Sequence, residues 1–133
     1  MSSEIFLDTN VIVHLFAREA EKRLRSEALI ADGATISVQV LNETALTLRR
    51  KLKMSWAAIA DVSSRLRDVC DVVPLTEATH VRGLAIATRH QLHVYDSMIV
   101  AAALLAGCST VHSEDLHDGL VIEGLTVLNP FRD

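Results

Sequence analysis

Short apolar segments alternate with longer segments of helical period along this chain. Apolar segments of strand length lie at 4–8, 34–38, 71–75, 109–113 and 120–130. The segments between them repeat their apolar residues at three- and four-residue steps. This predicts helices within 9–33 with a break near Glu19, over 38–53 and 56–68, after Thr76, and over 96–105. Strands that alternate with helices favour a parallel sheet covered by helices on both faces, so the pattern predicts an α/β fold.

The predicted helices differ in how much of their surface is apolar. The apolar stripe of helix 38–53 consists of Val38, Leu41, Ala45, Leu48 and Leu52, and that of the helix after Thr76 consists of Val81, Leu84, Ala85, Thr88 and Leu92. Each stripe predicts the face of its helix that packs inward. Helix 96–105 is apolar all round beyond its first turn, which predicts a buried helix. Ser55 and Thr76 are suitable N-caps, and Gly33 is a suitable helix end.

Composition places the chain among globular proteins. Of its 133 residues, 50% are hydrophobic and 23% are charged, which suits one domain over residues 1–133 with a sizeable core. No apolar run approaches the roughly 20 residues of a membrane-spanning helix, and the N-terminal segment lacks the pattern of a secretory signal. Cys70 and Cys108 stand in unrelated contexts, which is typical of buried thiols in a reducing compartment. We therefore expect a cytoplasmic protein without membrane contact.

The distribution of charge bears on nucleic-acid binding. The net charge is −4 and 4% of the residues are aromatic, which argues against a broad basic surface and against rows of stacking rings. Eight of the 13 Lys and Arg residues nevertheless fall in two clusters, Arg18, Lys22, Arg23 and Arg25, and Arg49, Arg50, Lys51 and Lys53. These clusters are either solvated helix ends or contacts for a nucleic acid.

Acidic side chains follow the predicted strands. Asp8 comes directly after the first strand, Asp115 lies just past the fourth, and Asp96 opens the buried helix. Glu43 follows the second strand and projects away from the Leu41–Leu48 stripe of its helix. Ligands of open α/β sheets bind beyond the carboxyl ends of the strands. We therefore expect these four acids at one edge of the sheet.

Several carboxylates at one edge repel one another, and a divalent cation relieves that repulsion. Ligands that are all oxygen suit Mg²⁺ or Mn²⁺, and one or two such ions can activate water against a phosphodiester. Each acid alone also has a plainer explanation. Asp8 and Asp96 suit helix caps, Asp115 suits a loop with Ser113 and Glu114, and Glu43 suits a solvated helix face. The shared edge is what favours the joint interpretation.

Other catalytic patterns are missing from the sequence. The six histidines form no His-Glu-x-x-His motif, the five glycines form no phosphate-binding loop, and neither cysteine has an evident histidine partner. His112 and His117 flank Asp115. They are either phosphate contacts or ordinary structural histidines.

Four segments, "FLDTNVIV", "VQVLNE", "VYDSMIVAAALLAGC" and "HSEDLHDG", in this order resemble the PIN-domain ribonucleases, and above all the VapC-type toxins of bacterial toxin–antitoxin pairs. The resemblance covers nearly the whole chain. It implies a PIN-like three-layer α/β/α sandwich with a short central parallel sheet. It also implies an endoribonuclease that depends on Mg²⁺ or Mn²⁺ and hydrolyses RNA phosphodiesters with a metal-activated water.

The resemblance also assigns roles to individual residues. Asp8, Glu43, Asp96 and Asp115 match the metal-binding and catalytic acids of the family, and Asn10 and Ser113 match polar residues that support the site. Family members commonly form homodimers and are blocked by a cognate antitoxin. We therefore expect an RNA substrate, an antitoxin partner and a homodimer for this chain.

Three alternatives differ from this hypothesis. One is a catalytically silent PIN-like domain that binds RNA or protein, against which the four intact acids argue. A second is a Mg²⁺-binding receiver-type signalling domain, which needs paired acids after the first strand, an aspartate after the third and a lysine near the end. This chain has "FLDTN" and "VVPL" at the first two places and no lysine after Lys53. A haloacid-type phosphatase would need Asp-x-Asp where the chain has Asp8, Thr9 and Asn10.

Overall fold

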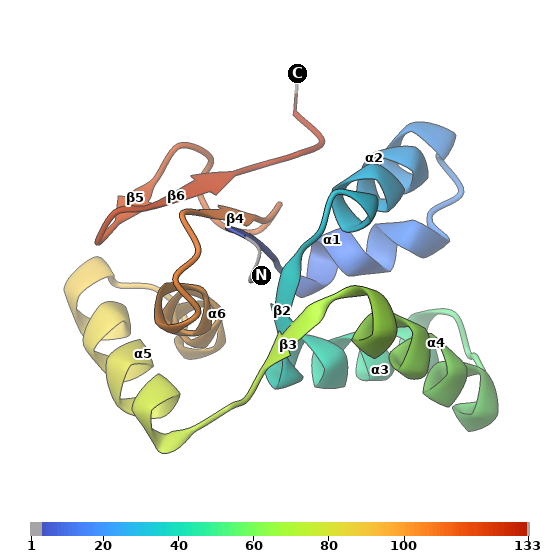
Figure 1. The fold of residues 1–133 in the computed structure, drawn as a ribbon, viewed down its shortest axis with the longest axis horizontal. Helices are drawn as coiled ribbons and strands as arrows, with labels where there is room; N and C mark the ends of the chain where they lie inside the picture. Colours follow the sequence, from blue (N-terminus) through green and yellow to red (C-terminus); the bar gives the residue numbers. More distant parts are fainter. Residues whose placement is uncertain (1–3, 133) are drawn as a thin grey trace.

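A computed structural model describes residues 4–132 as a mixed α/β fold (Figure 1). The strands are β1 Ile5–Leu7, β2 Thr35–Ser37, β3 Asp71–Val73, β4 Thr110–His112, β5 Val121–Ile122 and β6 Leu125–Leu128. The helices are α1 Thr9–Val13, the 3₁₀ helix η1 His14–Phe16, α2 Ala20–Ala31, α3 Val38–Lys51, α4 Trp56–Val69, α5 Glu77–His90 and α6 Val94–Leu105. The predicted break near Glu19 is confirmed, because α2 begins only after a bend at residues 18 and 19.

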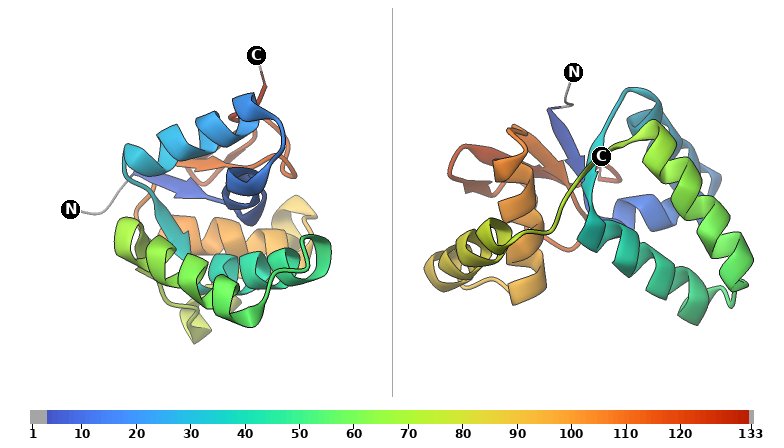
Figure 2. Two further views of the ribbon diagram at one scale, coloured as in Figure 1. Left: turned by 90° about the vertical axis from the view of Figure 1, so that its right-hand side faces the viewer. Right: turned by 60° about the horizontal axis from the view of Figure 1, so that its bottom comes forward.

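The six strands form one sheet in the order β3-β2-β1-β4-β6-β5. All neighbouring pairs are parallel except β5 with β6. Helices α1–α4 lie on one side of the sheet and α5 and α6 on the other, and the right-hand view of Figure 2 shows the same separation. The predicted three-layer α/β/α arrangement is therefore confirmed. Successive connections run outward from β1 to β3 and then return to β4 on the other side of β1, so β1 and β4 flank the point where the strand order reverses.

The core lies between the sheet and its two helical layers. Four of the strands contribute fully buried apolar side chains to this core: Phe6, Leu7, Ile36, Val111 and Val127. Every residue of α6 from Ser97 to Ala103 is buried, as its apolar sequence predicts. Cys70 and Cys108 are also buried, and they form no disulfide bond with each other. No helix within residues 4–132 is long and apolar enough to cross a membrane.

The C-terminal strand prediction is corrected by the structure. Segment 120–130 forms the hairpin β5–β6 rather than one strand, with Glu123 and Gly124 at its tip. Both turn residues have positive φ, 50° at Glu123 and 88° at Gly124, which is the geometry of a tight two-residue hairpin turn. The sheet is therefore antiparallel at this edge and parallel elsewhere.

The predicted inner face of α5 is wrong. Val81 and Leu84 are exposed by 62% and 45%, whereas Thr79, Gly83 and Ile86 are buried. The reason is the close approach of α5 to α6 at Gly83, where a Cβ would lie 2.9 Å from the Met98 Cε atom and 3.4 Å from the Met98 Cα atom. A glycine carries no hydrophobic signal, so the apolar stripe pointed to the wrong face.

This contact gives a prediction about stability. We expect Gly83→Leu to lower the free energy of unfolding by about 2 kcal/mol, because the new side chain overlaps Met98 in a packed interface. Chemical denaturation measures the change, and Met98→Ala in the same chain should restore part of it. The matched control is Ala85→Leu on the exposed face of the same helix. Equal effects of Gly83→Leu and Ala85→Leu would contradict the close packing.

The predicted helix ends agree with the structure at three places. The Ser55 hydroxyl accepts a hydrogen bond from the Ala58 backbone at 3.1 Å, and Thr76 forms a capping box with Thr79. Gly33 follows α2 with a φ of 95°. These caps fix where α2, α4 and α5 begin or end, and therefore the lengths of the loops between the sheet and the helices.

Candidate active site

The candidate site lies at the carboxyl ends of β1 and β4. These strands are parallel neighbours, with Leu7 paired to His112. The Asp8 backbone amide continues the pairing by donating to the His112 carbonyl at 3.0 Å. The residues that follow the two strands, Asp8 and Ser113, are thereby held side by side. This is the strand-order reversal at which open α/β sheets bind ligands.

Asp8 is a buried carboxylate that is enclosed by hydrogen bonds. It is 4% exposed and stands at the N-cap of α1. Its Oδ1 atom accepts from the Thr9 amide at 2.7 Å, and its Oδ2 atom accepts from the Ser113 hydroxyl at 2.8 Å. Burial, together with the negative charges of Glu43 and Asp96, raises the pKa of Asp8 from 3.8 to about 6, although these hydrogen bonds act to lower it. Asp8 is thus both a helix cap and part of an acidic group.

Asn10 and Ser113 connect Asp8 to the loop after β4. The Asn10 side-chain amide donates to Asp8 Oδ2 at 3.4 Å and to the Ser113 hydroxyl at 3.3 Å, and its carbonyl accepts from the Glu114 amide at 3.0 Å. The Ser113 hydroxyl also accepts from the Asp115 amide at 3.2 Å. These bonds fix the backbone that carries Asp115 relative to Asp8.

Glu43 reaches the same place from α3. Its Oε1 atom accepts a hydrogen bond from the Thr9 hydroxyl at 2.7 Å. Thr9 therefore bridges two acids, because its backbone amide binds Asp8 and its side chain binds Glu43. Sequence reasoning missed Thr9, although its place between Asp8 and Asn10 in "DTN" was the available signal. Glu43 lies away from the face that α3 turns to α4, as predicted, since Leu41, Ala45 and Leu48 line the contact with α4.

Asp96 and Asp115 complete the acidic group. Asp96 lies in the first turn of α6, which His93 caps, so the helix-cap explanation of Asp96 is wrong. Partial burial raises the pKa of Asp96, and the negative charge of Asp115 adds to the rise. The two carboxylates are therefore electrostatic neighbours, although one comes from a helix and the other from the loop after β4.

All four predicted acids line one pocket of about 430 Å³. The residues that line it are Asp8, Thr9, Asn10, Val13, His14, Glu43, Thr47, Lys51, Asp96, Glu114 and Asp115. Ser113 is fully buried behind Asp8. The structure therefore brings the predicted acids and both predicted supporting residues together. His112 and His117 do not line the pocket, and burial lowers the pKa of His112.

Glu114 is a fifth acid of this pocket, and its carboxylate is bound by two basic side chains. Its carboxylate contacts His14 Nε2 through one oxygen and Lys22 Nζ at 3.3 Å through the other. Partial burial works against ionisation, but the hydrogen bonds and charges of His14 and Lys22 hold the pKa of Glu114 below its usual range. Phe131 packs against the His14 ring, with centroids 4.5 Å apart. Sequence analysis treated Glu114 only as a loop residue.

The oxygen ligands that the pocket offers are of the kind that a hard divalent cation prefers. Asp8, Glu43, Asp96 and Asp115 offer only carboxylate oxygens, which Mg²⁺ and Mn²⁺ prefer. Within residues 4–132, no three His, Cys, Asp or Glu side chains are already arranged to enclose an ion. Burial and nearby negative charges raise the pKa values of Asp8 and Asp96, and a bound cation would offset the repulsion between these carboxylates.

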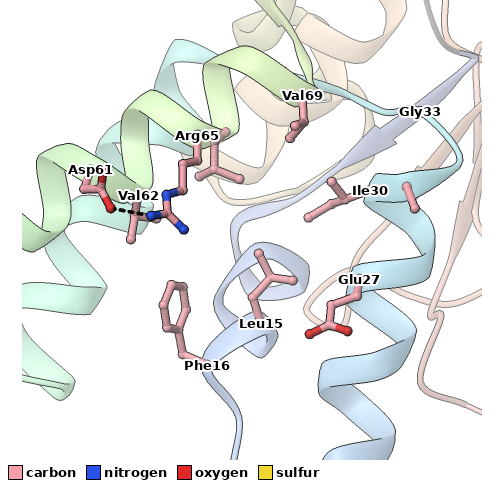
Figure 3. Close-up of a pocket in the computed structure, with 11 residues that line it drawn as sticks. Leu15, Phe16, Glu27, Ile30, Gly33, Asp61, Val62, Arg65 and Val69 are labelled. Carbon is pink, nitrogen blue, oxygen red and sulfur yellow. Dashed lines mark ion pairs between the residues drawn. The ribbon is translucent and has the colours of Figure 1, made fainter.

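A second, larger hollow of about 610 Å³ lies between η1, α2 and α4 (Figure 3). Its wall is mainly apolar, including Leu15, Phe16, Ile30 and Val69. The Asp61 carboxylate in it is paired with Arg65 at 3.2 Å. This groove lacks a group of unpaired acids, so we place the candidate active site in the smaller pocket.

The comparison with protein families decides the classification. The model of the PIN domain matches residues 5–117, which include all four acids and both supporting residues. The chain belongs to the PIN-domain family. No curated protein matches the sequence.

Solved structures with the same fold include several PIN toxins. A VapC toxin of Mycobacterium tuberculosis, described as cleaving the sarcin–ricin loop, is 23% identical over 84% of this chain and 89% of its own, with a TM-score of 0.67. A toxin–antitoxin complex from Klebsiella pneumoniae is 17% identical over 95% and 97%, with a TM-score of 0.68. The FitAcB structure from Neisseria gonorrhoeae is 20% identical over 96% of this chain and 98% of its own, with a TM-score of 0.65. These likenesses establish a common fold over nearly the whole length of the PIN domain.

Proposed function

We propose that this chain is an endoribonuclease dependent on Mg²⁺ or Mn²⁺, and the toxin of a type II toxin–antitoxin pair. The observation that carries the proposal is the convergence of Asp8, Glu43, Asp96 and Asp115 on one pocket at the edge of a PIN-type sheet. Residues 1–133 act as a single PIN-like domain in this proposal. Its substrate is RNA, and the bond that is hydrolysed is a phosphodiester.

Each residue has a definite task in this proposal. Asp8, Glu43, Asp96 and Asp115 would hold the cation, and Asn10 and Ser113 keep Asp8 in place. Thr9 orients the Glu43 carboxylate. A cation bound there would supply Lewis-acid chemistry, activating water and stabilising charge on the phosphodiester. Since Glu114 is held by His14 and Lys22, it serves the loop geometry rather than the cation.

The proposed partners follow from the same classification. Solved neighbours from Klebsiella pneumoniae and Rickettsia felis are described as a toxin–antitoxin complex and as VapBC2 bound to promoter DNA, which supports a cognate antitoxin for this chain. We expect part of that antitoxin to enter the acidic pocket with an arginine opposite the carboxylates. The proposed toxin acts in the cytoplasm as a homodimer.

The proposal is tested by incubating the purified protein, freed of any bound partner, with total bacterial RNA. Reactions contain Mg²⁺, Mn²⁺ or an excess of chelator. We expect discrete fragments in the presence of metal and intact RNA with chelator. A folded protein that binds metal but cleaves no RNA would contradict the nuclease and favour a PIN domain that only binds its target.

Metal binding itself should be visible in thermal unfolding. We expect Mn²⁺ to raise the melting temperature, because a ligand that binds only the native state stabilises it, by about 2.7 kcal/mol at one hundred times its dissociation constant. Differential scanning fluorimetry with and without Mn²⁺ measures the shift. Chelator should reverse it, and the Glu43→Gln/Asp96→Asn double variant should lose most of it. An equal shift in the double variant would place the ion elsewhere.

A further inference from the structure

One wall of the acidic pocket carries a free cation. Lys51, in the last turn of α3, is the one lysine or arginine among residues 4–132 that lines the pocket. Its side chain is exposed to solvent. Within the described part of the chain, its ammonium group takes part in no ion pair. A single unpaired cation therefore lies beside a group of carboxylates.

The neighbours of Lys51 are arranged differently. Arg49 turns toward α4, where its guanidinium lies 4.9 Å from the centre of the Trp56 ring and donates to the Met54 carbonyl at 2.9 Å. Lys22 does not line the pocket, and it is already bound to Glu114, which does. Of these three cations, Lys51 alone is both at the pocket and free to bind an incoming group.

The position of Lys51 on α3 relates it to the acids. Glu43, Thr47 and Lys51 all line the pocket at four-residue steps. Residues at this spacing lie on one face of a helix, with a rise of about 6 Å per step. This face thus changes from acidic at Glu43, through the Thr47 hydroxyl, to basic at Lys51. Long helical side chains tend to lean toward the helix N-terminus, which for Lys51 is the direction of Thr47 and of the pocket that both residues line.

We propose that Lys51 is a substrate-binding residue that holds an RNA backbone phosphate next to the bond to be cleaved. This inference rests on the proposed nuclease function. It explains how a polyanion approaches a pocket whose acids repel it in a chain with a net charge of −4. Since Lys51 stands about 12 Å along α3 from Glu43, the phosphate it binds flanks the cleaved one. Lys51 therefore sets which way the strand crosses the acids.

Binding of RNA can be measured without cleavage. In an Asp96→Asn chain, we would follow the fluorescence anisotropy of a labelled single-stranded oligouridine over a series of salt concentrations, in the presence of Mg²⁺. We expect Lys51→Met to weaken binding roughly three- to fivefold. It should also reduce the slope of log affinity against log salt by about 0.7, the value for one lost phosphate contact with a single strand. Lys51→Arg should restore both quantities.

Lys53→Met is the matched control. It removes the same charge from the same basic cluster, but Lys53 does not line the pocket. We expect the control to leave both quantities near those of the Asp96→Asn parent. If the parent binds RNA and Lys51→Met behaves like Lys53→Met, the role of Lys51 is overturned while the nuclease proposal stands. If the parent does not bind the RNA at all, the proposed function is contradicted and this inference falls with it.

Discussion

Replacing Asp96 by asparagine is expected to abolish RNA cleavage and leave the protein folded. The carboxylate lies in the acidic pocket, and both burial and the charge of Asp115 raise its pKa. Asparagine keeps the shape of the side chain but removes its charge, so the proposed cation site would lose one of its four carboxylates. The loss of activity should exceed the roughly 100-fold effect of disturbing residues that only support metal ligands.

The structure also explains why the fold should survive. His93 rather than Asp96 caps α6, and the helix is anchored by the buried run from Ser97 to Ala103. Circular dichroism and melting temperature check the fold, and cleavage of total RNA checks the activity. The matched control is Asp68→Asn, the same chemical change on an exposed part of α4. A folded Asp96→Asn chain that cleaves at the parental rate would remove Asp96 from the mechanism.

The position of the acids could be predicted because it depends on short-range patterns. Apolar segments mark the strands, and parallel strands end at one edge of a sheet, so Asp8 and Asp115 were expected to be neighbours. The flanking residues Asn10 and Ser113 were expected to support them, and both bind Asp8. The geometry of the sheet was enough for the expectation about Asp8 and Asp115, whereas the supporting roles of Asn10 and Ser113 were expected from the resemblance to the PIN family.

Contacts between distant segments could not be predicted in this way. The Thr9–Glu43 hydrogen bond joins residues 34 positions apart, and the His14–Glu114 contact joins residues 100 apart. Neither spacing has a period that a sequence pattern can reveal. The prediction of the buried face of α5 was wrong for a related reason, because α5 packs through Gly83 against Met98 of α6 rather than through an apolar stripe. Such packing depends on how two helices fit together, and the sequence pattern of one helix does not contain that information.

Replacing Asp8 by asparagine is expected to stabilise the metal-free protein at neutral pH and to inactivate it. The pKa of Asp8 is about 6 in the folded chain, against an ordinary value of 3.8 that applies when the chain is unfolded. Between these values the folded state binds more protons than the unfolded state. The free energy of unfolding of the parent therefore falls as the pH rises from about 4 to about 6, and stays low above that range.

The size of this effect follows from the shift in pKa. A difference of about two units between the folded and unfolded states corresponds to about 3 kcal/mol. Asparagine carries no charge at any pH, so the free energy of unfolding of the variant does not fall in this way as the pH rises. It also replaces one carboxylate oxygen by an amide group, which disturbs the acceptor for Ser113 and costs about 1 kcal/mol. The net gain in unfolding free energy above about pH 7 is therefore about 2 kcal/mol.

The measurement is chemical denaturation of parent and Asp8→Asn across a pH series, in chelator. Near pH 4 the parent carboxyl is largely protonated, so the variant should be no more stable than the parent; its advantage should appear as the pH rises through about 6. Asp68→Asn should show no such crossover. A difference that is constant with pH would mean that Asp8 is not an uncompensated buried charge. If the crossover is found, and if Mn²⁺ removes it by stabilising only the parent, then the Asp8 charge that destabilises the metal-free protein is also the charge that binds the ion.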